Sequence, residues 1–148
     1  MRREPTLRER ALRLLARREH SRAELAKKLK ARAETEDELD TLLDDLSRRK
    51  LLSDERYAES RAHVLSKKFG AARIAHDLRT RGVDADLADQ VLKAARVTEV
   101  ERAREVWRRK FRGVPRTREE RARQLRFLQS RGFSFEAIRA VVGRGDDD

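Results

Sequence analysis

Helix-start signals recur at short intervals along this chain of 148 residues. In five places a Ser or Thr stands three residues before a Glu, which is the spacing of a capping box at a helix N-terminus. The five pairs are Thr6–Glu9, Ser21–Glu24, Thr35–Glu38, Thr98–Glu101 and Thr117–Glu120. Ser53, Asp84 and Ser134 are expected to cap three more helices and Gly70 to begin another, so the sequence predicts nine helices.

The apolar residues within these segments follow the helical period, as at Leu39, Leu42, Leu43 and Leu46, and no stretch alternates as a strand would. Since 38% of the residues are hydrophobic and 44% are charged, the chain can fill small cores but not one large interior. Three short helices can bury their narrow apolar stripes against one another. We therefore expect an all-α fold in which nine helices form three tandem three-helix bundles.

One segment recurs fifty residues further on, because Leu78–Val83 (LRTRGV) matches Leu128–Phe133 (LQSRGF), with a weaker first copy at 29–33. The glycines of the two full copies, Gly82 and Gly132, are expected to form left-handed C-caps. A period of this length predicts a quasi-linear array, although coincidence among short amphipathic helices is an alternative. The expected units are repeat 1 at 1–52, repeat 2 at 53–97, repeat 3 at 98–143 and an acidic tail at 144–148.

The chain has a net charge of +11, from 38 Lys and Arg against 27 Asp and Glu, and thirty of the cations are Arg. Because the guanidinium fork suits phosphate oxygens, this excess indicates nucleic acid as a partner. The densest basic patch gives the first candidates for contact: Arg108, Arg109, Lys110, Arg112, Arg116, Arg118, Arg121, Arg123, Arg126 and Arg131. Secondary candidates are Arg22, Lys27, Lys28, Arg73, Arg79 and Arg81. The alternative is a solvated helix face, above all for Arg126 and Arg131, which adjoin apolar positions.

Aromatic residues lie among these arginines, an arrangement by which many proteins stack the bases of single strands. The spacing of Trp107 and Phe111, and of Phe133 and Phe135, favours core or helix-start packing instead. Phe127 departs from the apolar stripe of its segment, so the sequence leaves its role open.

Several classes of function lack the residues they need. The chain has no Cys, its three His fall in separate segments and are expected to be surface or capping residues, and no phosphate-binding glycine loop is present. The acidic run at 34–45 lies along one predicted helix, which does not make a metal site. We expect no enzyme activity, cofactor, metal or small-molecule substrate. Since the longest apolar runs have three residues, we expect no membrane contact and a cytoplasmic location.

Three stretches resemble the bacterial RecX family: ALRLLARREHSRAEL at 11–25, LLSDERYAES at 51–60 and RQLRFLQSRGFS at 123–134. The resemblance runs in one order over about residues 8–143, although the family's aromatic-glycine turn is reduced here to Phe69-Gly70. It implies an elongated, curved array of three-helix repeats that regulates the RecA recombinase negatively. Its implied partners are the RecA filament and single- and double-stranded DNA. The family is understood to lodge in the filament groove and to suppress ATP hydrolysis and strand exchange.

A different hypothesis is a helix-turn-helix-like DNA-binding protein that acts without a recombinase, using the helix pairs at 21–47 and 70–95. That function needs side chains at the start of a recognition helix that can approach DNA. The corresponding starts carry acids instead, Glu36 to Glu38 in one pair and Asp84 and Asp86 in the other, and phosphates would repel them.

Overall fold

The structure, a computed structural model, describes residues 3–143, and helices are the only regular elements within that range. In chain order they are α1 (Leu7–Arg17), α2 (Arg22–Leu29), the short 3₁₀ helix η1 (Lys30–Arg32), α3 (Glu36–Arg48), α4 (Asp54–Leu65), α5 (Ala71–Thr80), α6 (Ala85–Val97), α7 (Glu99–Lys110), α8 (Arg118–Ser130) and α9 (Phe135–Val142). The nine predicted α-helices and the all-α class are confirmed. The expected acidic tail at 144–148 lies outside the described residues.

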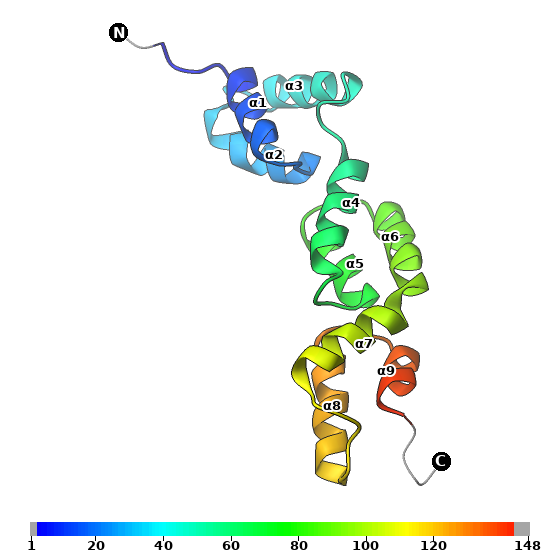
Figure 1. Cartoon of the computed structure of the whole chain (residues 1–148). Helices are drawn as coiled ribbons and strands as arrows, with labels where there is room; N and C mark the ends of the chain where they lie inside the picture. Colours follow the sequence, from blue (N-terminus) through cyan, green and yellow to red (C-terminus); the bar gives the residue numbers. More distant parts are fainter. Residues whose placement is uncertain (1–2, 144–148) are drawn as a thin grey trace.

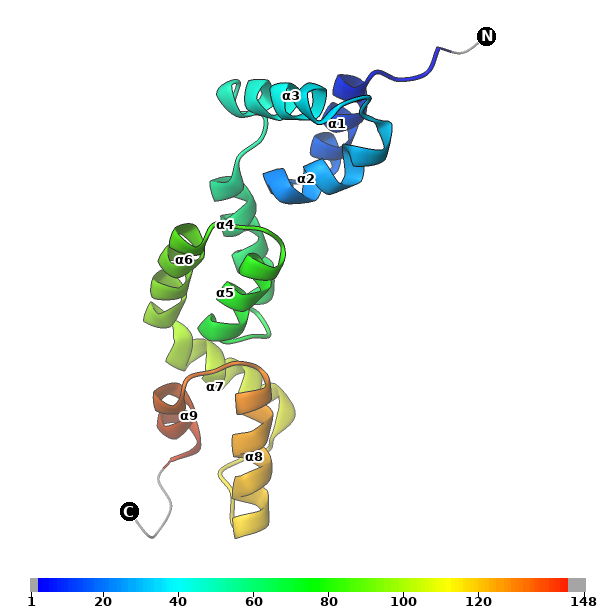
Figure 2. The ribbon, with the colours of Figure 1, turned by 180° about the vertical axis from the view of Figure 1, so that it is seen from behind.

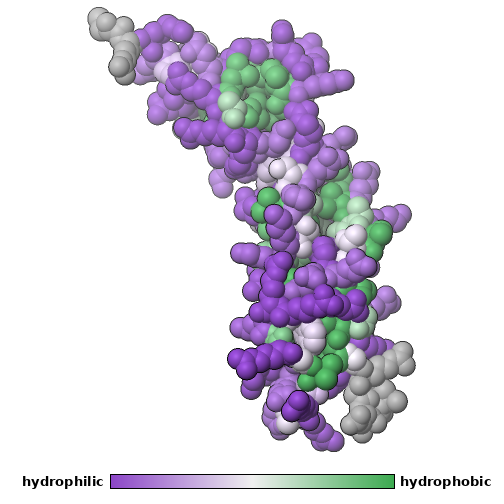
Figure 3. All heavy atoms as spheres, viewed as in Figure 1, coloured by the Kyte–Doolittle hydropathy of each residue, from purple (hydrophilic) through white to green (hydrophobic). Residues whose placement is uncertain are grey.

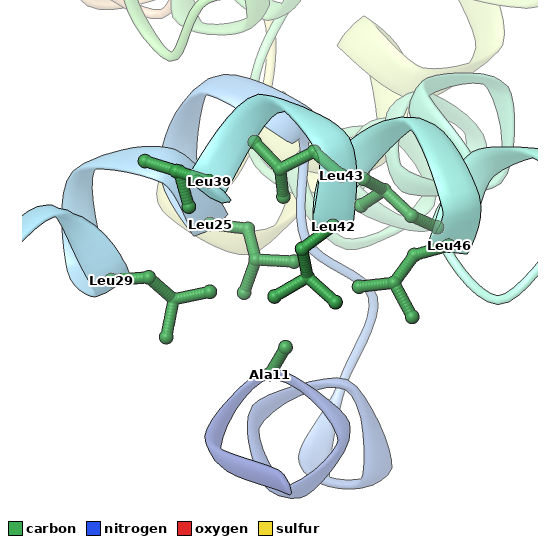
Figure 4. Packing of buried hydrophobic residues seen from close by; sticks show 8 residues of the cluster. Ala11, Leu25, Leu29, Leu39, Leu42, Leu43 and Leu46 are labelled. Carbon is green, nitrogen blue, oxygen red and sulfur yellow. The ribbon is translucent and has the colours of Figure 1, made fainter. Parts of the chain in front are cut away.

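Three separate apolar cores hold these helices in three bundles. In the first core, Ala11 of α1 faces Leu25 and Leu29 of α2 and the leucines of α3, including Leu43 and Leu46 (Figure 4). The second core joins α4, α5 and α6, and the third joins α7, α8 and α9. Each set of three consecutive helices therefore buries its own apolar stripes, as the composition predicts, whereas the residue-level boundaries of the repeats stay a prediction.

The three bundles follow one another in a bent row, with the two ends of the chain at opposite ends of the molecule (Figures 1 and 2). We refer to α1–α3, α4–α6 and α7–α9 as repeats 1, 2 and 3. Hydrophilic side chains cover most of the face seen in Figure 3, and apolar atoms show between them. The elongated, curved array is therefore confirmed.

Most of the predicted helix starts form as expected. The hydroxyls of Thr6, Ser21, Thr35, Ser53, Thr117 and Ser134 each accept a hydrogen bond from the third residue of the helix that follows. Thr98 and Asp84 also stand just before their helices, as predicted, but the prediction that their side chains cap these helices is wrong. The backbone of Thr98 is not extended (ψ 9°), and its hydroxyl instead accepts from Nε of Arg102 at 3.1 Å.

Residues with positive φ end four of the helices, α3, α5, α8 and α9, the last at Gly143 (φ 87°). Gly82 (φ 86°) and Gly132 (φ 85°) do so as predicted, each with the next N–H donating to a carbonyl five residues back. Lys50 (φ 62°) ends α3 in the same way, which the sequence does not signal because lysine has no preference for this conformation.

The first joint, between repeats 1 and 2, is made where the α5–α6 turn meets the start of α2. The hydroxyl of Ser21 donates to the carbonyl of Arg81 at 3.1 Å. A Cβ at Gly82 would overlap the Cβ of Ala23, so close approach and positive φ both require glycine there.

Charged side chains surround the first joint. Glu24 accepts from Arg18 at 3.0 Å and lies 3.9 Å from Arg81, while Asp77 accepts from Arg61 at 2.9 Å and from Arg81 at 3.2 Å. Burial alone would raise the pKa of Glu24 and of Asp77, but hydrogen bonds from Arg18 and Arg61 outweigh it and hold both pKa values below their usual range. Both carboxylates thus stay ionised at neutral pH.

His20, just before this joint, is expected to be a surface or capping residue, and since it is 1% exposed the surface alternative is wrong. Its Nδ1 lies 3.0 Å from the carbonyl of Arg18 and its Nε2 lies 2.9 Å from Nζ of Lys28. Burial, aided by the charges of Arg18 and Lys28, lowers the pKa of His20. The neutral ring donates through Nδ1 and accepts from the lysine through Nε2.

Candidate nucleic-acid interface

The second joint, between repeats 2 and 3, places the α8–α9 turn on the start of α5. The N–H of Gly70 donates to the carbonyl of Arg131 at 2.8 Å, and Nη1 of Arg73 donates to the carbonyl of Ser130 at 2.6 Å. A Cβ at Gly70 would overlap the carbonyl of Gly132. This turn is the second full copy of the repeated segment, and the first full copy forms the turn of the first joint. The fifty-residue period therefore marks the surface by which one repeat docks on the previous one.

A buried carboxylate at the start of α7 ties the second joint together. Glu99 is 4% exposed, and its Oε1 accepts from the N–H of Ala71 at 3.2 Å and from the N–H of Ser134 at 3.1 Å. It therefore satisfies the starts of α5 and α9 at once. One turn on, Arg102 donates to the carbonyls of Ser66 (3.1 Å), Phe69 (2.6 Å) and Ala95 (2.8 Å), and burial lowers its pKa.

Cations and aromatic rings alternate across this joint. Arg73 lies 4.3 Å from the centre of the Phe69 ring, and Arg131 lies 5.5 Å from Phe69 and 5.1 Å from Phe127. Lys110 lies 5.7 Å from Phe127 on the repeat 3 side. These distances are within the range of cation–π attraction. The contact of Arg131 with Phe69 therefore holds the end of α8 against repeat 2. The contact of Lys110 with Phe127 holds the end of α7 against α8.

The loop at 111–117, which carries Arg112 and Arg116, is anchored from α8. Buried Gln124 accepts from Nε1 of Trp107 at 2.8 Å and donates to the carbonyl of Gly113 at 3.0 Å. Glu120 accepts from the N–H of Arg116 at 2.8 Å. The arginines of the loop therefore extend from an anchored backbone.

Two hollows collect part of the predicted basic patch. The loop hollow, of about 580 Å³, is lined by Lys110, Arg112, Arg116 and Arg123 among others, with Glu120 as its acid. The joint hollow, of about 230 Å³, is lined by Arg109, Lys110 and Arg131 together with two residues of the α4–α5 turn, Lys67 and Lys68. The sequence does not signal that these two lysines belong to the site, because an isolated pair of cations some forty residues before the patch gives no sign that they meet it.

The other candidates of the patch line neither hollow. Arg108 pairs with Glu105 on the surface of α7 at 2.9 Å, and Arg121 donates to the carbonyl of Gly143 at 2.7 Å, which caps the end of α9. Arg118 and Arg126 are exposed on α8. Arg121 thus has a structural partner that the sequence did not predict.

The secondary candidates are spread over repeats 1 and 2. Arg22 pairs with Asp44 at 2.7 Å, Arg79 pairs with Asp89 at 2.7 Å, and Lys28 contacts His20. Arg73 and Arg81 contribute to the two joints, and Lys27 is exposed. The structure does not bring these six together in one site.

The aromatic predictions hold in part. Phe133 is buried and Trp107 packs against the core of repeat 3, as expected, but Phe135 is 62% exposed with Arg139 4.4 Å from its ring centre. Phe127 is half-buried and packs against the same core, with Phe111 edge-on at 5.5 Å. Its ring is therefore part core and part lining of the joint hollow.

Between residues 3 and 143 no three acidic, His or Cys side chains gather closely enough to hold a metal ion. Over the same range, none of the helices has the length and apolarity that crossing a bilayer requires. The candidate site is a surface of cations and aromatic rings, so the fold and this surface define a modular helical protein with a basic face.

Comparison with known sequences places this chain in a protein family. The profiles of the first, second and third three-helix domains of RecX match residues 8–46, 53–92 and 98–142. The regulatory protein RecX of Leptothrix cholodnii is 48% identical over 143 residues, covering 97% of this chain and 91% of that protein. That of Chromobacterium violaceum is 43% identical over 143 residues, covering 97% and 93%. The chain belongs to the RecX family of regulatory proteins.

A solved structure agrees with the fold. The crystal structure of RecX from Lactobacillus salivarius superposes with a TM-score of 0.80 at 22% identity, covering 92% of each chain.

Proposed function

We propose that this protein is a negative regulator of the RecA recombinase, which binds in the groove of the RecA–DNA filament and suppresses ATP hydrolysis and strand exchange. The observation that carries the proposal is the match of all three repeats, in order, to the three domains of RecX. The bent row of bundles supports it, since such a shape can extend along a filament groove (Figure 1).

The charges on the row suit a partner made of both DNA and protein. The two hollows of repeat 3 offer cations to phosphates, whereas the start of α3 exposes Glu36, Asp37 and Glu38. Acidic side chains repel DNA and attract basic protein surface. Binding along the groove would block the closure or strand entry that the recombinase needs.

The proposed regulator acts on the ATP turnover of its partner. The sequence has no glycine-rich loop followed by Lys and Ser or Thr, the motif that holds nucleotide phosphates in RecA-like ATPases. We propose a cytoplasmic, non-enzymatic role in which DNA and the RecA filament are the partners.

The test measures ATP hydrolysis by RecA on single-stranded DNA at several salt concentrations while the protein is added. We expect turnover to fall at stoichiometries where binding is independently seen. Unchanged turnover under those conditions refutes the proposal. A helix-turn-helix reader would instead bind duplex DNA with base preference and leave RecA unaffected.

The loop hollow supplies the matched variants. Arg112→Ala/Arg116→Ala/Arg123→Ala should weaken DNA binding and reduce the slope of log affinity against log salt by about 2, since each lost phosphate contact removes ~0.7–0.9. Arg13→Ala/Arg17→Ala/Arg32→Ala removes the same charge from exposed positions of repeat 1 and should change the slope little. Equal slopes for the two triple variants would place the DNA surface elsewhere.

A further inference from the structure

The joint hollow concentrates positive charge without an acid to balance it. Its volume is about 230 Å³, and five of its seven lining residues are cations. They come from three elements: Lys67 and Lys68 from the α4–α5 turn, Arg109 and Lys110 from the last turn of α7, and Arg131 from the end of α8. Repeat 2 and repeat 3 each supply part of the site, so it exists only while the second joint is closed.

The cations at the rim are available to a ligand. Among residues 3–143, no acid forms an ion pair with Lys67, Lys68 or Arg109, and all three side chains are exposed. Like charges held together repel one another unless an anion lies between them. Binding of a polyanion would relieve this repulsion. Lys110 and Arg131, which lie beside the Phe127 ring, would add two more positive charges to the attraction.

The floor of the hollow is apolar. Val106 and Phe127 line it, and Phe111 supports the Phe127 ring edge-on at 5.5 Å. The hollow is smaller than the ~300–1,000 Å³ of typical small-molecule sites, so it fits a segment of a polymer better than a whole free ligand. A duplex keeps its bases paired inside and presents phosphates, whereas a single strand also exposes sugar and base faces that can lie on an apolar or aromatic floor.

We propose that the joint hollow binds single-stranded nucleic acid, with phosphates at Lys67, Lys68 and Arg109 and a sugar or base against Phe127 and Val106. The inference deepens the nucleic-acid part of the proposed function. It concerns only this chain and the strand, and it needs no recombinase to be tested.

The test measures fluorescence anisotropy of a labelled oligonucleotide, single-stranded or in a duplex of the same length, with the full chain over a range of salt. Lys67→Ala/Lys68→Ala should lower the affinity for the single strand roughly tenfold and reduce its salt slope by about 1.4, because each single-strand phosphate contact contributes ~0.7. The affinity for the duplex should fall by much less.

The matched control is Lys93→Ala/Arg96→Ala, which removes two exposed cations of repeat 2 from α6, away from this hollow. It should leave the preference for the single strand unchanged. Equal losses in the two double variants, or an equal loss for single strand and duplex after the lysine change, would overturn the inference.

Phe127→Leu tests the floor while keeping it apolar. It should weaken single-strand binding several-fold at an unchanged salt slope, because stacking is lost and no phosphate contact is removed. Thermal unfolding of the variant shows whether repeat 3 stays folded, and if it does not, the exposed lysine pair decides whether the hollow binds the strand. Single-strand binding through the hollow without an effect on RecA would refute the proposed function and leave this inference standing.

Discussion

The first and second joints dock the same repeated turn on the start of a second helix, but different chemistry holds each one. At the first joint the contacts run through side chains: the Ser21 hydroxyl, Glu24 and Arg81. At the second joint the N–H of Gly70 donates directly to the next repeat, and buried Glu99 bonds two helix starts. The two turns therefore dock in the same way although the residues that receive them differ. We expect the first joint to respond to salt and pH and the second to respond to changes in shape.

The largest effect should follow from Glu99→Ala at the second joint. It leaves the N–H groups of Ala71 and Ser134 buried without an acceptor and removes the acid beside Arg102, which should lower the free energy of unfolding by about 3 kcal/mol. Denaturant unfolding measures the loss. Glu101→Ala, at an exposed position of the same helix, should stay within about 0.5 kcal/mol. A similar value for both variants would show that the carboxylate is not what closes this joint.

The next largest effect should come from the residue just before the receiving helix, which is Gly70 in the second joint and Ser21 in the first. Gly70→Ala forces a Cβ into the carbonyl of Gly132 and should cost about 2 kcal/mol, whereas Ser21→Ala removes a cap and one hydrogen bond and should cost about 1 kcal/mol. Gly113→Ala has open space around it and serves as the control. If Ser21→Ala lowers the free energy of unfolding more than Gly70→Ala does, the backbone contact at Gly70 contributes less to the second joint than its geometry indicates.

A smaller difference should separate the two arginines of the repeated segment. Arg131→Ala removes contacts with Phe69 and Phe127 and should cost about 1 kcal/mol. Arg81→Ala removes partly exposed ion pairs and should cost about 0.5 kcal/mol, a loss that added salt reduces. Thermal unfolding at low and high salt compares them, and a salt-sensitive loss for Arg131→Ala would contradict the assignment.

The smallest effect is a pH dependence at the first joint. Because the pKa of folded His20 is lowered, its contribution to stability is complete above the ordinary value near 6.5 and is lost as pH falls below it. The lowered pKa values of Glu24 and Asp77 mean that their contributions are lost only in more acidic solution, as pH falls through those values. Urea unfolding at about pH 7 and about pH 5.5 should show a modest decrease in stability that His20→Asn removes. No decrease in the parent protein would mean that His20 is protonated without cost.

The class of fold could be predicted because it depends on local signals. Ser and Thr caps, the leucine period of α3 and the two glycines describe helices and their ends, which neighbouring residues largely determine. At Thr98 and Asp84 the helices begin as predicted without a side-chain capping bond, and at Thr98 the reason is a backbone that lacks the extended conformation of a capping residue.

The candidate site was only half predictable. The density of arginine located the basic patch, but which members face a hollow depends on the packing of α7, α8 and the loop between them. Lys67 and Lys68 join the site through the second joint, a contact between segments far apart in the sequence. The repeated segment contacts Ser21 in the first joint and Gly70 in the second. Because these two residues differ, comparing the sequence with itself does not reveal that they occupy equivalent positions.

The single residue between α6 and α7 determines how repeat 3 is oriented relative to repeat 2. Since only Thr98 separates the two helices, α7 turns across the end of α6 with a bend that this one residue sets (Figure 1). One residue inserted within the first turn of α7 would rotate the rest of that helix by about 100° and advance it by about 1.5 Å. Lys67 and Lys68 would then no longer face Arg109. The length of this link therefore keeps the cations of the two repeats on one side of the molecule. Of all the connections between helices, we expect this one to tolerate an inserted residue least.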